Sequence, residues 1–374
     1  MVHVIKSDIS DRKFVSEFVR VGTEIILESP PGIARLETEL KDHLSKINPY
    51  FMDSKVRLFI AYDHHRPIGR ISAQITDINK ETGTGHFGFL AAKDSEALRA
   101  MLEAAQNWLK SEGCSKIEGP YSLSINDEVG LLVDGADKAP RILMNYSPGW
   151  MSKAIESFGY NPAKDLLAYD LDLKAPLPET ILKISNQAKE TMGLEIREIS
   201  RKNLKSDLKI VQNIFNKAWA ENWGFIPISD ADLAYMEHTL KPVLDPRLTH
   251  LAFFHGHPIA MIVALPDINE IIKDFKGKLL PFNWLRLLWR LKLKTPQNAR
   301  VLLMGVVPEH QSGFKAGVSS LVIITELHAT LRDKNYQSVE MSWILENNKP
   351  MRKLIERLGG EITRRYRVYE KELD

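Results

Sequence analysis

The residues best suited to bind a ligand lie between 306 and 322, in the stretch VVPEHQSGFKAGVSSLV. A β-branched run ends at Pro308, and the small residues Gly313, Ala316 and Gly317 precede an apolar pattern typical of a helix. Where a strand leads through small residues into a helix, backbone N–H groups and the positive end of the helix dipole favour a bound phosphate. An ordinary strand-to-helix turn has the same composition, so the stretch alone leaves both interpretations open.

A second segment, NNKPMRKLIERLGG at residues 347–360, follows one expected strand later. Its apolar residues recur at helical spacing, with Asn348 at the start and Gly359 at the end. An amide at the first position and a glycine after the last turn are typical of helix caps. The segment therefore predicts a short capped helix beside the candidate phosphate loop.

The elements that must position these segments follow an order that occurs twice. In each half the pattern predicts a strand, a helix, a hairpin, a strand, a helix, a strand, a helix and a final strand. This order indicates an α/β fold with a mixed sheet in each half. The expected ranges are 2–7, 11–27, 56–75, 85–92, 94–113, 114–123, 148–159 and 165–173, then 194–200, 208–223, 250–267, 299–307, 318–335, 338–345, 348–359 and 364–373.

The element order and the two segments together resemble the GNAT superfamily, the Gcn5-related N-acyltransferases. Its acyl-CoA site combines a Gln/Arg-x-x-Gly-x-Gly/Ala loop with a later Asn-x-x-Ala-x-x-Leu-Tyr-x-x-Leu-Gly helix, and residues 194–373 follow that order. The resemblance implies two tandem GNAT-like lobes and an acetyl-CoA or longer acyl-CoA as co-substrate. It assigns CoA contacts to Val306, Val307, Gln311, Ser312, Gly313, Lys315, Ala316, Gly317, Val318 and Asn348, although the loop is longer than the family pattern.

The chemistry that the resemblance implies is direct attack of an amine on the thioester. Glu346, which follows an expected strand, is the candidate base, and Tyr366 or Tyr369 on the last strand is the candidate acid. Ile355 stands where many members have the tyrosine that protonates the leaving thiolate. A thiol with a pKa near 8.5 leaves tolerably without full acid assistance. The alternative is that Glu346 caps a helix and the tyrosines only pack.

The first half lacks the glycines of the phosphate loop. Its counterpart, FGFLAAKDSEALRAML, places Asp94 where a phosphate would lie, and a carboxylate there repels an anion. We therefore expect residues 1–175 to form a degenerate lobe, 176–193 a connection, and 194–374 the acyl-CoA-binding lobe, with an amphipathic insertion at 271–298.

The insertion contains KGKLLPFNWLRLLWRLKLK at residues 276–294, with a helix expected from Pro281. At 100° per residue, Arg286, Arg290 and Lys294 form one narrow stripe on an otherwise apolar helix. No acid occurs between Phe275 and Pro308. The composition suits peripheral contact with an anionic membrane through 278–294, and it equally suits a buried helix that bridges the lobes.

The acceptor is indicated by a weaker resemblance to a bacterial group of GNAT-like proteins that includes ceramide synthases. This resemblance rests on the two-lobed length and on the stretches LLPFNW and YRVYEKEL. Trp219, Asn222 and Trp223 fall where this fold binds its acceptor, although such aromatic residues are more often core. We therefore expect N-acylation of a hydrophobic or lipid-like amine. The alternatives are an acetyl-CoA N-acetyltransferase for small amines or peptides, and a non-catalytic GNAT-fold binding protein.

Composition narrows the partners and the compartment. The formal charge is only +2, so we expect no nucleic-acid role. Cys114 is the single cysteine, which excludes an internal disulfide and suits a cytoplasmic protein, peripheral at most on the inner membrane face. We expect no metal, and the sequence leaves the oligomeric state open.

Overall fold

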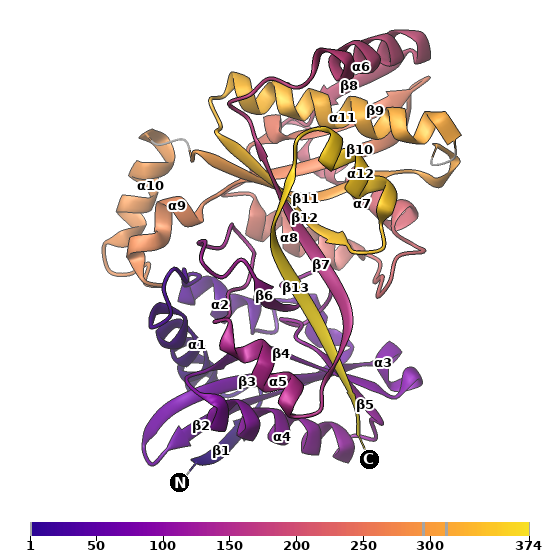
Figure 1. The fold of residues 1–374 in the computed structure, drawn as a ribbon. Helices are drawn as coiled ribbons and strands as arrows, with labels where there is room; N and C mark the ends of the chain where they lie inside the picture. Colours follow the sequence, from indigo (N-terminus) through magenta and orange to yellow (C-terminus); the bar gives the residue numbers. More distant parts are fainter. Residues whose placement is uncertain (1, 294–295, 311–312, 374) are drawn as a thin grey trace. The chain divides into compact units, whose positions relative to one another are not determined.

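The computed structural model describes residues 2–293, 296–310 and 313–373, with the backbone alone at 313–316. The chain forms two compact units (Figure 1). Unit 1 consists of Met1–Leu166, Ile271–Lys294 and Arg364–Asp374, and unit 2 of Leu167–Glu270 and Thr295–Thr363. The insertion and the C-terminal strand thus group with the first unit, whereas the sequence pattern placed both in the second.

Unit 1 is built on the strand order β1-β2-β3-β4-β5-β13, with β6 pairing with β13. Within it β4 and β5 are parallel, while the pairs β1–β2, β2–β3, β3–β4 and β5–β13 are antiparallel. Its elements are β1 (Val2–Ser7), α1 (Arg12–Leu27), α2 (Glu37–His43), η1 (Pro49–Met52), β2 (Ser54–Asp63), β3 (Arg66–Thr76), α3 (Asp77–Thr82), β4 (Thr84–Ala92), α4 (Ser95–Ser111), β5 (Lys116–Gly119), β6 (Leu131–Asp134), α5 (Trp150–Ser157), the start of β7 (Asn161–Asp172), η3 (Lys273–Phe275), α10 (Asn283–Leu293) and most of β13 (Glu361–Glu372).

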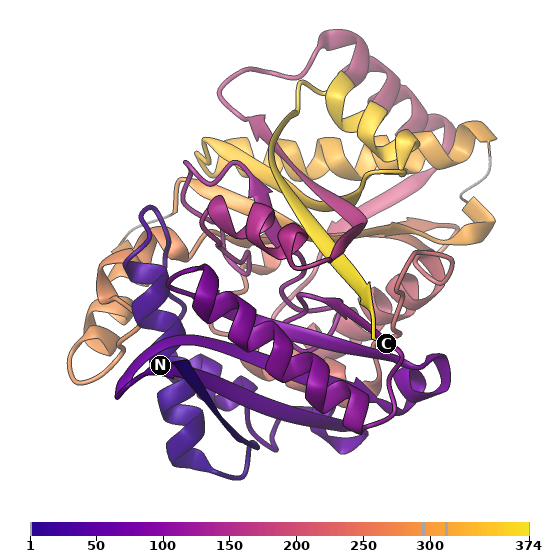
Figure 2. The same cartoon turned by 60° about the horizontal axis from the view of Figure 1, so that its bottom comes forward.

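The sheet of unit 1 is buried on both faces because its strands carry apolar residues at successive positions. On β2, Leu58 and Ile60 belong to the core beneath α1, whereas Phe59 and Ala61 belong to the core beneath α4. Figure 2 shows α4, in purple, lying along one face of this sheet. The unit therefore has three layers, with a helix on each face of the sheet.

Unit 2 has the strand order β7-β12-β11-β10-β9-β8. The pair β11–β12 is parallel, and the pairs β8–β9, β9–β10 and β10–β11 are antiparallel. Its further elements are α6 (Glu179–Met192), β8 (Leu194–Glu198), α7 (Leu204–Ala218), α8 (Asp230–Leu240), η2 (Pro246–Leu248), β9 (Thr249–Phe254), β10 (His257–Pro266), β11 (Asn298–Val306), η4 (Pro308–His310), α11 (Gly313–Asp333), β12 (Ser338–Leu345) and α12 (Lys349–Arg357), while α9 (Asn269–Ile272) begins at its edge.

Helices α7 and α11 cover opposite faces of the unit 2 sheet. A Cβ on Gly305 would contact Ala218 at the end of α7, whereas His250, in a row one residue away, bonds Thr330 of α11 (3.2 Å). Neighbouring rows of a sheet point to opposite faces. Helix α11 is apolar on more than one side because α6 packs on it as well, with Ser185 and Thr325 hydroxyls 2.6 Å apart.

Most expected elements are present, with some differences. The inserted helix begins at Asn283 rather than Pro281, α7 ends at Ala218 rather than at 223, and α11 begins at Gly313 rather than at 318. The short elements α2, α3, α8, α9 and β6 were not predicted. None of the described helices is long and apolar enough to span a bilayer.

Candidate functional site

The candidate site lies where β11 and β12 of unit 2 separate. The two strands pair from Asn298↔Ser338 to Val301↔Met341, yet β11 continues to Val306 and β12 to Leu345. Because β10 remains paired with β11 as far as Val306, the far end of β11 keeps one partner and turns its other edge toward the separation. An extended ligand with amide groups can add to such an edge.

Main-chain directions at the end of β11 distinguish the two valines assigned to CoA. The N–H of Val307 donates to the carbonyl of Ile259 (2.8 Å), and its carbonyl accepts from His310 (2.9 Å). Both groups of Val307 are thus already used within the protein. Alternation along an antiparallel pair turns the main-chain groups of Val306 and Met304 away from β10, toward the separation. The end of β11 therefore directs alternate main-chain groups to either side, with Val307 bonded on the β10 side.

Trp219, assigned to the acceptor, contacts this same part of β11. Its indole Nε1–H donates to the carbonyl of Met304 (2.9 Å), and its ring packs on Phe215 with centroids 5.0 Å apart. Met304 lies in the stretch of β11 beyond the last pair with β12. The structure therefore brings one predicted acceptor residue to the predicted CoA strand.

The segment after Trp219 is held firmly on α7. Asn216 exchanges two hydrogen bonds with the main chain of Ile228, each of 2.9 Å, and Gln212 donates to the same carbonyl (2.8 Å). Asn222 and Trp223 lie between these anchors and are half-buried. The main-chain N–H of Asn222 donates to the carbonyl of Trp219 (2.8 Å). The segment thus forms a closed loop beside β11.

A buried polar group lies where the paired part of β11 and β12 ends. Arg300 and Glu340 face each other in register, are 3% and 0% exposed, and approach to 3.8 Å. Ser342 joins them, because its hydroxyl donates to Glu340 (2.9 Å) and accepts from Arg300 Nε (2.9 Å). The Arg300 guanidinium also lies 4.8 Å from the Trp343 ring centroid, a cation–π distance. This group fixes the point from which the strands diverge.

The structure describes only part of the expected phosphate loop. Gln311 and Ser312 lie outside the described residues, and for Gly313, Lys315 and Ala316 the backbone alone shows that α11 has begun. Gly317 is exposed, and a Cβ there would have open space around it. Val318 is buried, so its side chain contributes to the core.

Asn348 and Glu346 lie together at the end of β12. The Asn348 side chain accepts from the N–H of Met351 (3.2 Å) and caps α12, as its sequence position predicted. Arg352 donates to the carbonyl of Glu346 (2.8 Å) and to the hydroxyl of Tyr169 (3.1 Å). The Glu346 side chain is half-buried. The turn that carries both predicted residues is therefore braced by α12 and β7.

The two candidate acids belong to unit 1. Tyr366 is fully buried, pairs with Leu132 of β6, and its hydroxyl lies 3.4 Å from the carbonyl of Asn145. Burial raises the pKa of Tyr369, whose hydroxyl donates to Glu156 (2.9 Å). Both tyrosines have packing roles in that unit, and Glu346 belongs to unit 2. Their catalytic role stays a prediction.

The corresponding separation in unit 1 is closed by the chain itself. Strands β4 and β5 pair only from Thr84↔Lys116 to His86↔Glu118. Beyond that point the N–H of Tyr121 donates to the carbonyl of Phe87 (2.7 Å). The approach is so close that a Cβ on Gly88 would lie 1.6 Å from the Tyr121 carbonyl oxygen. At the following helix, Asp94 caps α4 by accepting from Ala97 (2.8 Å).

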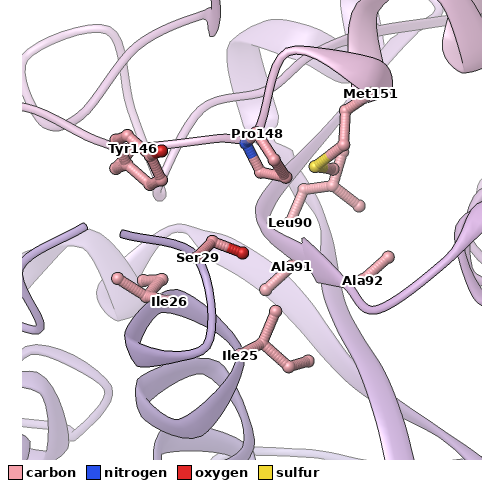
Figure 3. A pocket seen from close by; sticks show the side chains of 9 residues that line it. All are labelled: Ile25, Ile26, Ser29, Leu90, Ala91, Ala92, Tyr146, Pro148 and Met151. Atoms are coloured by element: carbon pink, nitrogen blue, oxygen red, sulfur yellow. The ribbon is translucent and has the colours of Figure 1, made fainter. Parts of the chain in front are cut away.

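A small hollow remains farther along β4 (Figure 3). Ile25 and Ile26 of α1, residues 90–92 of β4, and Tyr146 and Met151 contribute to its walls. Its volume of about 10 Å³ is room for about one water molecule.

Sequence reasoning missed the buried Arg300–Glu340 pair and the bracing role of Arg352. The signal for the pair was present, since each of two otherwise apolar strands carries one ion, of opposite charge. Buried ions are generally paired, so this pattern could have identified the two strands as neighbours. Nothing in the spacing of Arg352 distinguishes it from the solvent-facing cations of α12.

Two proteins are similar to this chain over nearly its full length. Bacterial ceramide synthase from Caulobacter vibrioides is 36% identical over 365 residues, covering 96% of this chain and 95% of that protein. Protein YghO from Escherichia coli K12 is 37% identical over 361 residues, covering 95% and 92%. No protein-family model matches the chain.

The fold is also similar to that of solved structures. A tandem GNAT protein from the clavulanic acid biosynthesis pathway superposes with a TM-score of 0.59 at 11% identity, covering 100% of this chain and 99% of the other. The glucosamine N-acetyltransferase region of a fungal β-N-acetylglucosaminidase gives a TM-score of 0.60 at 12% identity, covering 99% of this chain and 38% of the other. The resemblance to the tandem GNAT fold is thereby confirmed.

Proposed function

The chain belongs to the family that includes bacterial ceramide synthase and is an acyl-CoA-dependent N-acyltransferase, and we propose that it joins a long acyl chain to an amphiphilic amine of the sphingoid-base class. The name of the relative supports this acceptor. The observation that carries the proposal is the separation of β11 from β12 in unit 2, with Trp219 held against the stretch of β11 beyond its last pair with β12.

The residues of unit 2 suit an acyl-CoA. As the resemblance implies, the pantetheine arm would lie along the end of β11 at Val306, and the start of α11 would receive the pyrophosphate near Gly317. Asn348 would contact the arm beside its capping bond. Among the remaining assignments, the residues that would also contact CoA in this proposal are Gln311, Ser312, Gly313, Lys315 and Ala316. Val307 and Val318 would act only by positioning the backbone.

The reaction forms a C–N bond between the amine and the acyl carbon and breaks the C–S bond of the thioester. We assign the amine proton to Glu346, which Arg352 holds in place through its carbonyl. The thiolate of CoA is a tolerable leaving group, so the buried Ile355 on α12 does not prevent turnover.

Unit 1 has a structural role in this proposal and binds no CoA. Tyr121 occupies the hydrogen-bonding edge of β4, and the Asp94 carboxylate accepts from the N–H of Ala97 in the first turn of α4. The hollow on β4 is far too small for a nucleotide. Buried Cys114 is consistent with a reducing compartment, and we place the protein in the cytoplasm.

Calorimetric titration with palmitoyl-CoA below its micelle concentration and with acetyl-CoA tests the assignment. We expect both to bind, with at least tenfold preference for palmitoyl-CoA, because a long chain adds apolar contact. Mass spectrometry after addition of sphinganine should then detect the N-acyl product, and Glu346→Gln should slow its formation. Preference for acetyl-CoA would indicate a small amine or peptide acceptor, and binding without product for any amine would indicate a non-catalytic protein.

A further inference from the structure

Helix α10 turns its polar side toward the protein. Arg286 and Arg290 both pair with Asp274, at 2.6 Å and 2.5 Å, and their guanidinium groups lie 5.3 Å and 5.2 Å from the ring centroid of buried Phe275. Arg290 also donates to the carbonyl of Ile271. Arg286 and Arg290 of the predicted cationic stripe therefore lie on the attachment side of the helix, whereas a surface helix normally attaches through its apolar side. Lys294, the third residue of that stripe, lies outside the described residues.

The apolar side of α10 consequently faces outward. None of its described residues is buried. At about 100° per residue, Leu288 lies about 160° from Arg290 around the helix axis, on the opposite side. The exposed apolar residues of α10 and the turn before it are Leu280 (66%), Phe282 (71%), Trp284 (42%), Leu285 (50%), Leu288 (52%), Trp289 (59%) and Leu293 (65%). A contiguous patch of this kind indicates an interaction surface.

The segment is fixed to unit 1 rather than loosely appended. The N–H of Glu37 donates to the carbonyl of Gly277 (2.8 Å). Gly277 has a positive φ, and a Cβ there would lie 2.9 Å from the Thr23 side chain. The turn that leads into α10 is thus packed against α1 and α2, and the outward direction of the apolar face is set by these contacts.

The exposed charges of the segment itself are of one sign. Lys276, Lys278 and Lys292 are exposed, and no acid occurs between Phe275 and Pro308. The only nearby carboxylate of the segment, Asp274, is paired with two arginines, which hold its pKa well below its usual range. Two copies of this surface would bring lysines against lysines, because a twofold contact places the same patch on both sides. An anionic partner suits it better.

We propose that this surface, Leu280–Leu293 with its flanking lysines, docks on an anionic lipid bilayer. The helix would lie in the plane of the interface, with Leu288 and Phe282 among the acyl chains. Trp284 and Trp289 would occupy the boundary, where a ring with one polar N–H is favoured. The lysine stems would extend so that their ammonium groups reach lipid phosphates. The Arg–Asp274 contacts would keep the apolar side turned to the membrane.

Flotation of the full-length protein with vesicles tests the proposal without substrate, so its result is independent of the N-acyltransferase assignment. We expect binding to vesicles of phosphatidylglycerol and phosphatidylcholine, and at least tenfold weaker binding to phosphatidylcholine alone. Leu288→Asp should reduce partitioning at least tenfold. The matched control is Ile78→Asp on α3, where the side chain is also exposed (65%), and this variant should partition like the wild type.

Two further variants separate the contributions. Trp289→Ala should weaken partitioning several-fold without placing a charge in the helix, which keeps the test valid if Leu288→Asp lowers the yield of folded protein. The double variant Lys276→Glu with Lys278→Glu should lose the preference for anionic lipid. Lys183→Glu, at an exposed position of α6, should retain it. Three results would each overturn the proposal. The wild type could fail to bind vesicles, or Leu288→Asp and Trp289→Ala could both partition like the wild type. Alternatively, sedimentation could show a dimer that Leu288→Asp dissociates, without vesicle binding.

Discussion

The two units solve the same geometric problem in different ways. Each has a parallel strand pair that separates after a few residues, followed by a helix whose N-terminus lies near the separation. In unit 1 the chain fills the gap, with Tyr121 bonded to β4 and Asp94 capping α4. In unit 2 the end of β11 is bordered by Trp219, and exposed Gly317 lies near the start of α11.

In our proposal, the difference teaches that one backbone arrangement can either bind a ligand or fill the ligand's place with groups of the protein itself. A main-chain N–H supplied by Tyr121 satisfies the carbonyl of Phe87 that a pantetheine-like group would otherwise meet. A carboxylate at a helix N-terminus similarly takes the position of a phosphate. In our proposal, these few residues therefore determine which unit binds CoA.

The largest effect is expected from Gly88→Ala in unit 1. The added methyl group would overlap the Tyr121 carbonyl, and relieving that overlap should lower the free energy of unfolding by about 3 kcal/mol. Gly149→Ala is the control, because its Cβ meets nothing within 4 Å. Urea denaturation of both variants measures the difference. Equal stability would mean that the Tyr121 segment does not fill the gap in solution.

A second substitution makes unit 2 resemble unit 1. Gly317→Asp adds a carboxylate near the start of α11, and repulsion of the pyrophosphate should weaken acyl-CoA binding about tenfold, or ~1.4 kcal/mol. Gly317→Ala should bind normally, since open space surrounds this position. Calorimetry compares the two. Undiminished affinity of the aspartate variant would place the phosphate site elsewhere.

The smallest effects distinguish a cap from a ligand contact. Asp94→Ala should lower stability by about 1 kcal/mol and leave the Kd for acyl-CoA unchanged. Asn348→Ala should lower stability similarly and also raise that Kd, because Asn348 serves both roles in our proposal. Asn348→Ser retains an oxygen for the N–H of Met351, so it should restore stability but not affinity. If affinity follows stability in all three variants, Asn348 is only a cap.

Local patterns predicted much of the fold. The glycine and proline signals and the helical spacing of residues 94–113 and 318–335 identified α4 and α11, and the caps at Asp94 and Asn348 were evident from their types. The placement of β7 and β13 was not predictable in this way. Both strands carry ordinary alternating patterns, and which sheet a strand joins depends on contacts remote in sequence.

Residues 276–294 show a similar limit. Periodicity located the stripe of Arg286 and Arg290 correctly, but two opposite orientations have the same helical wheel. The orientation is decided by Asp274 in η3, which pairs with both arginines. No periodic pattern in the sequence indicates this pairing. Likewise, the spacing of residues 364–373 indicated a strand that contains Tyr366 but not the pairing of this residue with β6 in unit 1.

The exchange of the final strands also bears on how the protein is made. Strand β5, at residues 116–119, has β13 as its neighbour, and β13 ends at Glu372. The unit that contains β5 thus stays incomplete on the ribosome until residue 372 has been translated. Chains usually fold domain by domain from the N-terminus during synthesis, and an open β edge is prone to aggregate. A nascent chain of this protein therefore carries an open edge on β5 until β13 has been made, and loss of residues 364–373 would damage a unit whose other strands were made long before.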